Sequence, residues 1–173
     1  MFRLATENDL NEVEKIFHEI LDHEAETISY SNWIKGKYPT MAHAKKALDE
    51  GTLYVGEDET GRLFGCVNLN HIQLDEYSKI PWEYEAEGED VFVIHMLCIR
   101  PDQARMGRGK AFIAYAEELA REKGCKVVRI DTYEGNKPAE NLYTSLGYRL
   151  AGKTLFFFQQ VIWENLICLE KKL

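Results

Sequence analysis

The candidate functional residues of this 173-residue chain lie between positions 91 and 148. A turn with the sequence Arg105-Met106-Gly107-Arg108-Gly109-Lys110 separates an apolar run from an amphipathic segment. Backbone N–H groups at the start of a helix have no helical partner, and they carry the positive end of the helix dipole. With three basic side chains around it, the turn is a candidate anion-binding site. A turn whose glycines serve only its geometry is the alternative.

This turn needs a strand before it and a helix after it. Val91–Ile99 is an apolar run rich in β-forming residues, and it is too short to span a membrane. From Gly109 onward the apolar period is helical, and Gly124 stands where a left-handed C-cap belongs. The pattern therefore predicts a strand, a turn and a helix over residues 91–124.

Two common phosphate-binding motifs do not fit the turn. Ala111 follows Lys110, where a P-loop has Ser or Thr, and the earlier glycine of that motif is missing. Phe112 occupies the position of the third glycine in a dinucleotide fingerprint. The anion must therefore be held in another way.

A second motif runs from Asn136 to Tyr148. At 3.6 residues per turn, Asn136 and Tyr143 lie on one face of a helix with the small Ala139 between them. A small residue between two polar ones leaves a groove for a slender ligand, and Leu142 with Leu146 would face the core from another side. A capped helix whose tyrosine only packs is the alternative.

Together the two motifs resemble the GCN5-related N-acetyltransferase superfamily, most specifically from about Val91 to Tyr148. Gly107 and Gly109 match its loop pattern Gln/Arg-x-x-Gly-x-Gly/Ala, although Ala104 stands at the Gln/Arg position. The second motif is similar to the family's N-x-x-A-x-x-L-Y-x-x-x-G-F/Y segment at every defined position. The resemblance implies an enzyme that transfers an acetyl group from acetyl-CoA directly to a primary amine of a small molecule or a peptide, without a covalent enzyme intermediate.

The resemblance also implies roles for individual residues. The pantetheine arm would pair with the main chain of Leu97, Cys98 and Ile99. The pyrophosphate would be held by backbone amides of the turn, namely Arg105, Met106, Gly107, Arg108, Gly109 and Lys110. Asn136 and Ala139 would line the cofactor, and Tyr143 would contact it and protonate the departing thiolate.

An amine with a pKa near 10 must lose a proton before it attacks. Family members often place a glutamate on the central strand, but Val93 occupies that position here. His95 is the first candidate for the general base, because it lies two residues further along and projects from the same face. Asp131, on the next strand, is the second candidate, and a purely structural histidine is the alternative. Cys98 is expected to be a core residue, since no His–Asp pattern accompanies it.

Net charge and composition restrict the kinds of partner that we expect for this chain. The net charge of −8 argues against nucleic acid as a partner. Asp75–Asp90 is strongly acidic and could attract a cationic acceptor, although a solvated acidic loop is the alternative. The four cysteines have no CxxC spacing, so we expect buried free thiols and no metal site. The N-terminus lacks the pattern of a signal peptide and no segment has the length of a membrane span, so we expect a cytoplasmic monomer or homodimer without a membrane partner.

The remaining periodicity predicts a helix capped by Asn8 or Asp9, an irregular region over residues 24–40 and a helix over residues 41–49. Strands are expected over residues 2–5, 53–57, 63–70, 126–133, 148–158 and 165–170. We therefore expect residues 1–173 to form a single α/β N-acetyltransferase domain. Its one mixed, mostly antiparallel sheet would have about seven strands, helices on both faces and, from the resemblance, a central V-shaped splay.

A second class of function stays open. Ala104 at the usual Gln/Arg position would also suit a non-catalytic acyl-CoA-binding sensor or regulatory module. Against this, the family's pyrophosphate contacts come mainly from the backbone, and Tyr143 is retained. Detection of free thiol released in the presence of an amine would separate the two classes.

Overall fold

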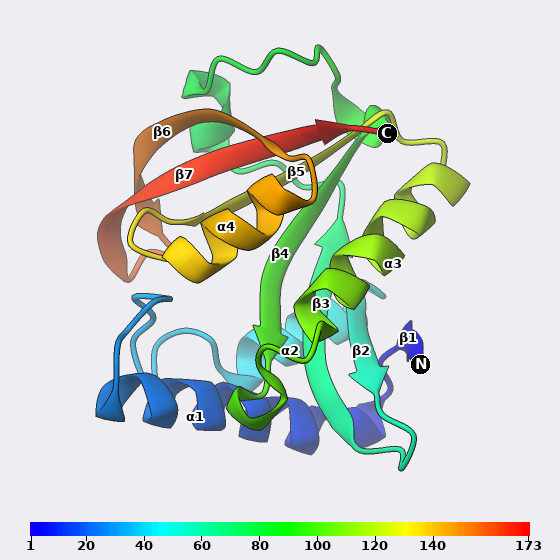
Figure 1. Cartoon of the computed structure of the whole chain (residues 1–173), viewed down its shortest axis with the longest axis vertical. Coiled ribbons are helices and arrows are strands. Elements are labelled where there is room, and N and C mark those ends of the chain that lie inside the picture. Colours follow the sequence, from blue (N-terminus) through cyan, green and yellow to red (C-terminus); the bar gives the residue numbers. More distant parts are fainter. The chain divides into compact units, whose positions relative to one another are not determined.

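Seven strands form one mixed sheet in the order β1-β2-β3-β4-β5-β7-β6 in the computed structural model, which describes all 173 residues (Figure 1). The strands are β1 (Phe2–Leu4), β2 (Leu53–Glu57), β3 (Leu63–Asn70), β4 (Val91–Ile99), β5 (Val127–Tyr133), β6 (Arg149–Phe158) and β7 (Ile162–Lys172). Antiparallel ladders join β1 to β2, β2 to β3, β5 to β7 and β7 to β6, whereas β4 and β5 run parallel. The expected mixed, mostly antiparallel sheet is confirmed.

The helices also follow the predicted order. The α-helices are α1 (Leu10–Glu26), α2 (Met41–Asp49), α3 (Arg108–Glu122) and α4 (Lys137–Ser145). Short 3-10 helices are η1 (Glu7–Asp9), η2 (Asp75–Lys79), η3 (Gly88–Asp90) and η4 (Pro101–Gln103). None of these helices combines the length and the apolar composition that a membrane crossing requires.

The chain divides into two units, and β4 and α3 each pass from one unit to the other. The first unit contains Met1–Ser29, Trp33–Leu69 and Met96–Tyr115. The second contains Tyr30–Asn32, Asn70–His95 and Ala116–Leu173. Each unit has a hydrophobic core of its own. The assignment of residues 1–173 to a single domain stays a prediction.

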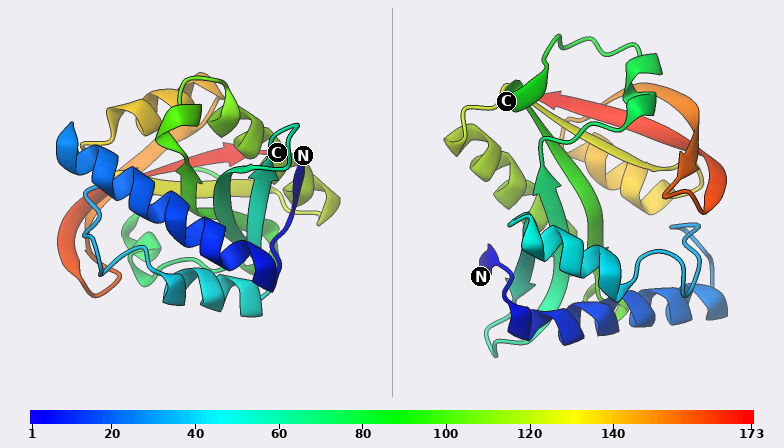
Figure 2. Two further views of the ribbon diagram at one scale, coloured as in Figure 1. Left: turned by 90° about the horizontal axis from the view of Figure 1, so that it is seen from below. Right: turned by 180° about the vertical axis from the view of Figure 1, so that it is seen from behind.

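In the first unit, α1 and α2 bury their apolar faces against β2 and β3, and the start of α3 lies on the other side of these strands (Figure 2, left). The buried residues of α1 are Leu10, Val13, Ile16, Phe17 and Leu21. The helix continues to Glu26, so the prediction of irregular structure from Glu24 was wrong at its first residues. One more helical turn is stabilised there because Leu21 continues the i, i+4 stripe after Phe17.

The N-terminus of α1 also differs from the prediction. Asp9 stands at the N-cap position of α1, but its side chain makes no capping hydrogen bond there. Its carboxylate instead accepts hydrogen bonds from Arg3 at 2.7 and 2.9 Å and from the backbone N–H of Thr6 at 2.7 Å. The Arg3 guanidinium holds the pKa of Asp9 down at about 2. Asp9 therefore ties β1 to the entry of α1.

In the second unit, α4 lies on one side of β5 and β7, and the connection between β3 and β4 lies on the other (Figure 2, left). Tyr77 and Ile80 of this connection are buried against Val93, Phe156 and other strand residues. Part of the acidic segment Asp75–Asp90 is therefore structural, because its apolar residues close a core while Glu85, Glu87 and Glu89 stay exposed. Strand β7 begins at Ile162, three residues before the predicted start.

All four cysteines are free and buried, as the sequence predicts. Gly124 has a φ of +79°, which confirms the left-handed C-cap of α3. Asn136 caps α4 as expected, since its Oδ1 accepts a hydrogen bond from the N–H of Ala139 at 3.2 Å. These features depend only on neighbouring residues.

Arg100, directly after β4, is the first unit's most buried charged side chain, with 1% of its surface exposed. Its Nε donates to the carbonyl oxygen of Leu63 at 2.6 Å, and its guanidinium forms ion pairs with Glu12 and Glu19 of α1. Its backbone N–H donates to the carbonyl oxygen of Phe64 at 2.9 Å. A single residue thus joins α1, β3 and the segment that leads into α3.

We predict that Arg100→Met destabilises the protein, because it leaves two carboxylates and a buried carbonyl without their donor. Glu12 and Glu19 keep contact with water, so we expect a loss of about 2 kcal/mol in the free energy of unfolding rather than the full cost of a buried pair. Thermal and urea unfolding measure it.

Arg62→Met is the matched control, because Arg62 forms an exposed ion pair with Asp102 at 2.8 Å. This control should leave the melting temperature unchanged. Equal melting temperatures for the two variants would contradict the role given to Arg100.

Candidate active site

The parallel ladder between β4 and β5 ends in mid-strand. Val91–Ile94 pairs with Val127–Ile130, and the next residues on the two strands are His95 and Asp131. Met96 then has a φ of +52°, which is rare for a residue with a side chain and bends the strand out of a regular ladder. This is where a splay between the strands would begin, and both candidates for the general base stand directly at that point.

The second half of β4 carries the residues expected to pair with pantetheine. Leu97 and Ile99 are half-buried, and Cys98 is buried in the core of the first unit, as predicted. A Cβ atom on Gly65 of β3 would lie 2.4 Å from the carbonyl oxygen of Cys98. Glycine is therefore required at position 65 for the close approach of β3 to this part of β4.

The turn before α3 is exposed, from Ala104 to Gly107. Arg105 and Gly107 have φ values of +62° and +77°, so the chain curls twice in the left-handed region before the helix starts. The first helical hydrogen bond runs from the N–H of Ala111 to the carbonyl oxygen of Gly107 at 3.0 Å. The N–H groups of Arg108, Gly109 and Lys110 precede that bond and form the open N-terminus of α3.

The basic side chains of the turn do not all behave alike. Arg105 and Lys110 are exposed. Arg108 is half-buried, its guanidinium lies 4.5 Å from the centre of the Phe64 ring, and its Nε donates to Gln103 at 3.3 Å. An anion at this helix end would therefore meet mainly backbone donors and the two exposed cations.

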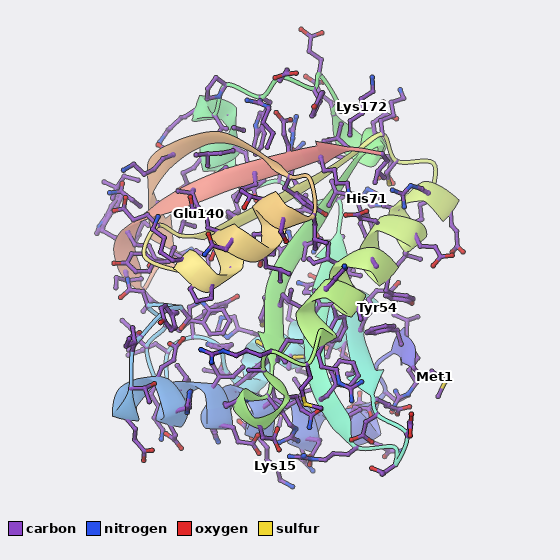
Figure 3. All side chains as sticks on the ribbon, in the orientation of Figure 1. Met1, Lys15, Tyr54, His71, Glu140 and Lys172 are labelled. Atoms are coloured by element: carbon purple, nitrogen blue, oxygen red, sulfur yellow. The ribbon has the colours of Figure 1, made fainter.

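Further along α3, ring contacts fix the helix on the first unit. The Tyr54 ring, labelled in Figure 3, lies 5.8 Å from that of Tyr115, and the Phe112 ring lies 5.5 Å from that of Phe64. These contacts hold the first half of the helix, and with it the turn, against β2 and β3.

In the second unit, α4 carries Asn136, Ala139 and Tyr143. Tyr143 is 5% exposed, and its ring lies 6.1 Å from the ring of Tyr148. Tyr143 is buried and Leu142 is half-buried, so the division of α4 into a ligand face and a core face stays a prediction. Glu140, labelled in Figure 3, is half-buried and pairs with Lys137 at 2.6 Å.

His95 is held by acceptors from the β3–β4 connection. Its Nε2 lies 3.0 Å from the carbonyl oxygen of Ile72 and 3.1 Å from Oδ1 of Asn70. A carbonyl oxygen can only accept, so Nε2 carries the proton and Nδ1 keeps the lone pair. Burial lowers the pKa of His95 to about 4. The imidazole is therefore neutral at neutral pH, but it is a weak base.

The pKa of Asp131 is shifted in the opposite direction to that of His95. It is half-buried, and its Oδ2 accepts a hydrogen bond from the hydroxyl of Tyr77 at 2.7 Å. Burial raises the pKa of Asp131 to about 6, although the Tyr77 hydrogen bond opposes the shift. The carboxylate is therefore mostly ionised at neutral pH, and it is the stronger base of the two.

A cavity of about 1130 Å³ opens in the β3–β4 connection of the same unit. Its lining includes Asp75, Tyr77, Trp82, Glu85, Glu87 and Arg129. The acidic residues at this cavity are exposed, whereas Arg129 is 4% exposed. Three acidic residues, Asp75, Glu85 and Glu87, therefore line this cavity together with Tyr77.

Tyr77, Arg129 and Glu164 are not among the residues that the sequence motifs indicate. Glu164 on β7 is 5% exposed, and it accepts a hydrogen bond from Nδ2 of Asn32 at 2.7 Å. Burial raises the pKa of Glu164. One signal was present for Arg129, because it is a charged residue inside the otherwise apolar run Val127–Ile130. Tyr77 gave no signal, since its partner Asp131 is 54 residues away.

The structure thus brings Tyr77 to Asp131 and holds His95 on the β3–β4 connection within the second unit. The turn and Leu97–Ile99 belong to the first unit, while α4 belongs to the second. The donors at the turn suit a phosphate group, and Asp131 suits a proton transfer near neutral pH.

Comparison with known proteins gives a family match. The model of the acetyltransferase (GNAT) family matches residues 13–148. A GNAT-family acetyltransferase from Streptococcus agalactiae 2603 aligns with a TM-score of 0.83 at 19% identity, covering 100% of this chain and 95% of that chain. Ribosomal-protein-alanine N-acetyltransferase from Brucella melitensis aligns with a TM-score of 0.71 at 20% identity, covering 100% and 99%.

A third structure, yncA from Salmonella typhimurium with its cofactor acetyl-CoA, aligns with a TM-score of 0.69 at 15% identity, covering 99% of this chain and 92% of that chain. A comparison with curated protein sequences gives no significant match. At these identities the solved structures establish the fold, and the family match carries the classification.

We predict that His95 stays neutral in the folded protein down to a pH far below the ordinary imidazole range. Folded His95 should titrate with a midpoint near pH 4, against about 6.5 in urea, because burial disfavours the charged ring. Histidine NMR signals, assigned with His95→Gln, measure the titration. A folded-state midpoint near 6.5 would refute the buried, hydrogen-bonded imidazole described above.

Proposed function

The chain belongs to the acetyltransferase (GNAT) family, and from that premise we propose that it is an N-acetyltransferase. It transfers an acetyl group from acetyl-CoA directly to the primary amine of a small molecule or a peptide. Bound acetyl-CoA supplies the activated thioester. The chain's own residues hold the phosphates, orient the acceptor and move two protons.

The observation that carries the cosubstrate assignment is the exposed turn at the start of α3. The N–H groups of Arg108, Gly109 and Lys110 have no helical acceptor, and the dipole of α3 favours negative charge there. Arg105 and Lys110 add exposed positive charge. These donors fit a pyrophosphate, and Leu97, Cys98 and Ile99 would offer main-chain groups to the pantetheine arm.

Asp131 is the general base in this proposal, in place of His95. A base works best when its pKa lies near the working pH, and the value of about 6 for Asp131 is closer to neutral than the value of about 4 for His95. A carboxylate also attracts the ammonium form of the acceptor. Desolvation of that ammonium lowers its pKa and reduces the cost of the proton transfer.

Tyr143 is the general acid. A phenol, with an ordinary pKa near 10, can give its proton to a thiolate leaving group. Asn136 and Ala139 would line the cofactor from the same helix, although Oδ1 of Asn136 is already used for the cap.

The acceptor is cationic in this proposal. Asp75, Glu85 and Glu87 line the cavity in the β3–β4 connection, and carboxylates around one opening concentrate cations there. Tyr77 lines the same cavity and donates a hydrogen bond to Asp131, so one residue connects the cavity to the proposed base.

A non-catalytic acyl-CoA sensor is the alternative, on account of Ala104. Ala104 is exposed, and the donors of the turn belong to the backbone of other residues. The absence of a Gln or Arg side chain at position 104 therefore weakens the case for strong cofactor binding without favouring a sensor.

We predict that acetyl-CoA in large excess raises the melting temperature by several degrees, because a ligand of the native state stabilises it by mass action. Gly109→Glu should abolish this shift, since it places a carboxylate beside the N–H groups that would meet phosphate. Ala114→Glu adds the same charge at an exposed position further along α3 and should keep the shift. A wild-type protein stabilised by another nucleotide and not by acetyl-CoA would rule out the cosubstrate.

We predict that Tyr143→Phe lowers kcat by roughly 100-fold while the KM for acetyl-CoA changes little, because only the proton donor is lost. An amine panel with detection of the free thiol finds the acceptor and measures the rate. Tyr148→Phe is the control, since it removes the hydroxyl of the neighbouring buried ring. If Tyr143→Phe kept the full kcat, Tyr143 would not be the general acid.

A further inference from the structure

The connection between β3 and β4 is fastened to the sheet at its backbone. Nη2 of Arg129 on β5 donates to the carbonyl oxygen of Tyr84 at 3.0 Å, and its Nη1 donates to the side chain of Gln73. Glu170 on β7, which is fully buried, accepts hydrogen bonds from the N–H of Glu83 at 2.8 Å and of Tyr84 at 3.4 Å. Two buried charged residues therefore hold an exposed acidic segment in a fixed place.

Arg129 also holds Tyr77 in place, through contacts with Trp82. The Trp82 ring lies 4.2 Å from the guanidinium of Arg129 and 5.2 Å from the ring of Tyr77. The indole N–H of Trp82 donates to the carbonyl oxygen of Tyr77 at 2.9 Å, and the ring of Phe156 packs against Tyr77 at 6.4 Å. With 2% of its surface exposed, Tyr77 is held in place by these contacts.

The hydroxyl of Tyr77 ends at Asp131. It donates to Oδ2 at 2.7 Å, and no other hydrogen bond of the structure reaches the carboxylate. Burial and the nearby carboxylate raise the pKa of Tyr77 well above its ordinary value, so the phenol stays protonated and always donates. One carboxylate oxygen is thus fixed, and Oδ1 is left for an acceptor.

We propose that Tyr77 is a positioning residue, whose hydroxyl orients the carboxylate of Asp131 and keeps it ionised for the acceptor amine. This inference rests on the proposed function, in which Asp131 is the general base. In this proposal the β3–β4 connection does more than attract cations, because its residue Tyr77 is the hydrogen-bond donor to Asp131.

The groups around Asp131 leave no substitute for this donor. Glu76 and Tyr77 face it from η2, and Cys168 and Glu164 face it from β7, whereas Arg129 of β5 acts on Tyr77. Glu76 and Glu164 are acidic and disfavour its ionised form. Burial raises the pKa of Cys168 well above its ordinary value, so it is a neutral thiol. Arg129, the one cation, is engaged by Gln73, Tyr84 and Trp82.

Tyr77→Phe tests the proposal, because it keeps the ring and removes only the donor. Losing a hydrogen bond to a charged group should move the acidic limb of the kcat/KM profile up by about one pH unit. The rate should therefore fall several-fold near pH 6.5 and recover above pH 8. Tyr84→Phe is the matched control, since Tyr84 holds the segment through its backbone. It should leave the profile in place.

Two further measurements separate the role from structure and from the proposed function. Carboxyl NMR of Asp131, which needs no substrate, should show its pKa raised in Tyr77→Phe and unchanged in Tyr84→Phe. Added to Asp131→Asn, Tyr77→Phe should cause no further change in the pH profile.

An unchanged Asp131 titration together with an unmoved acidic limb would overturn the proposal. An acidic limb that His95→Gln moves and Tyr77→Phe does not would overturn it as well. If the chain transfers no acetyl group to any amine of the panel, the proposed function fails, and the carboxyl titration still decides whether Tyr77 holds Asp131.

Discussion

A parallel ladder that stops in mid-strand is the constraint on which the site depends. The last pair is Ile94 with Ile130, and the left-handed Met96 prevents β4 from continuing in the same register. A backbone that leaves its ladder keeps donors and acceptors that a ligand can use. The residues next to this break, His95 and Asp131, both have shifted pKa values, so the candidate bases stand where the ladder ends.

Buried charge supports this arrangement at a cost in desolvation. Arg129 and Glu170 lie inside the second unit and satisfy backbone groups of the β3–β4 connection, rather than pairing with each other. Arg100 does the same in the first unit, between α1 and the carbonyl oxygen of Leu63. Such residues add little net stability compared with apolar packing, but they allow only one placement of the loops that they hold. Irregular segments such as the β3–β4 connection can therefore hold functional groups in fixed positions.

Much of the fold could be predicted from the sequence because its signals are local. The caps at Gly124 and Asn136, the helical stripe of α1 and the strand before the turn depend on residues a few positions apart. The contacts that tune the site are not local. Arg100 and Glu12 are 88 residues apart, and Tyr77 and Asp131 are 54 apart, so their pairing depends on the packed tertiary structure. His95 illustrates the consequence, since its type suggested an ordinary imidazole whereas burial makes it a weak base.

In the proposed function, the turn before α3 and the second half of β4 hold acetyl-CoA. A crystal structure of the protein with acetyl-CoA tests it most directly. We expect pyrophosphate oxygens at about 3 Å from the N–H groups of Arg108, Gly109 and Lys110, and the pantetheine arm against Leu97–Ile99. Well-ordered acetyl-CoA bound elsewhere, with no phosphate at this turn, would contradict the account.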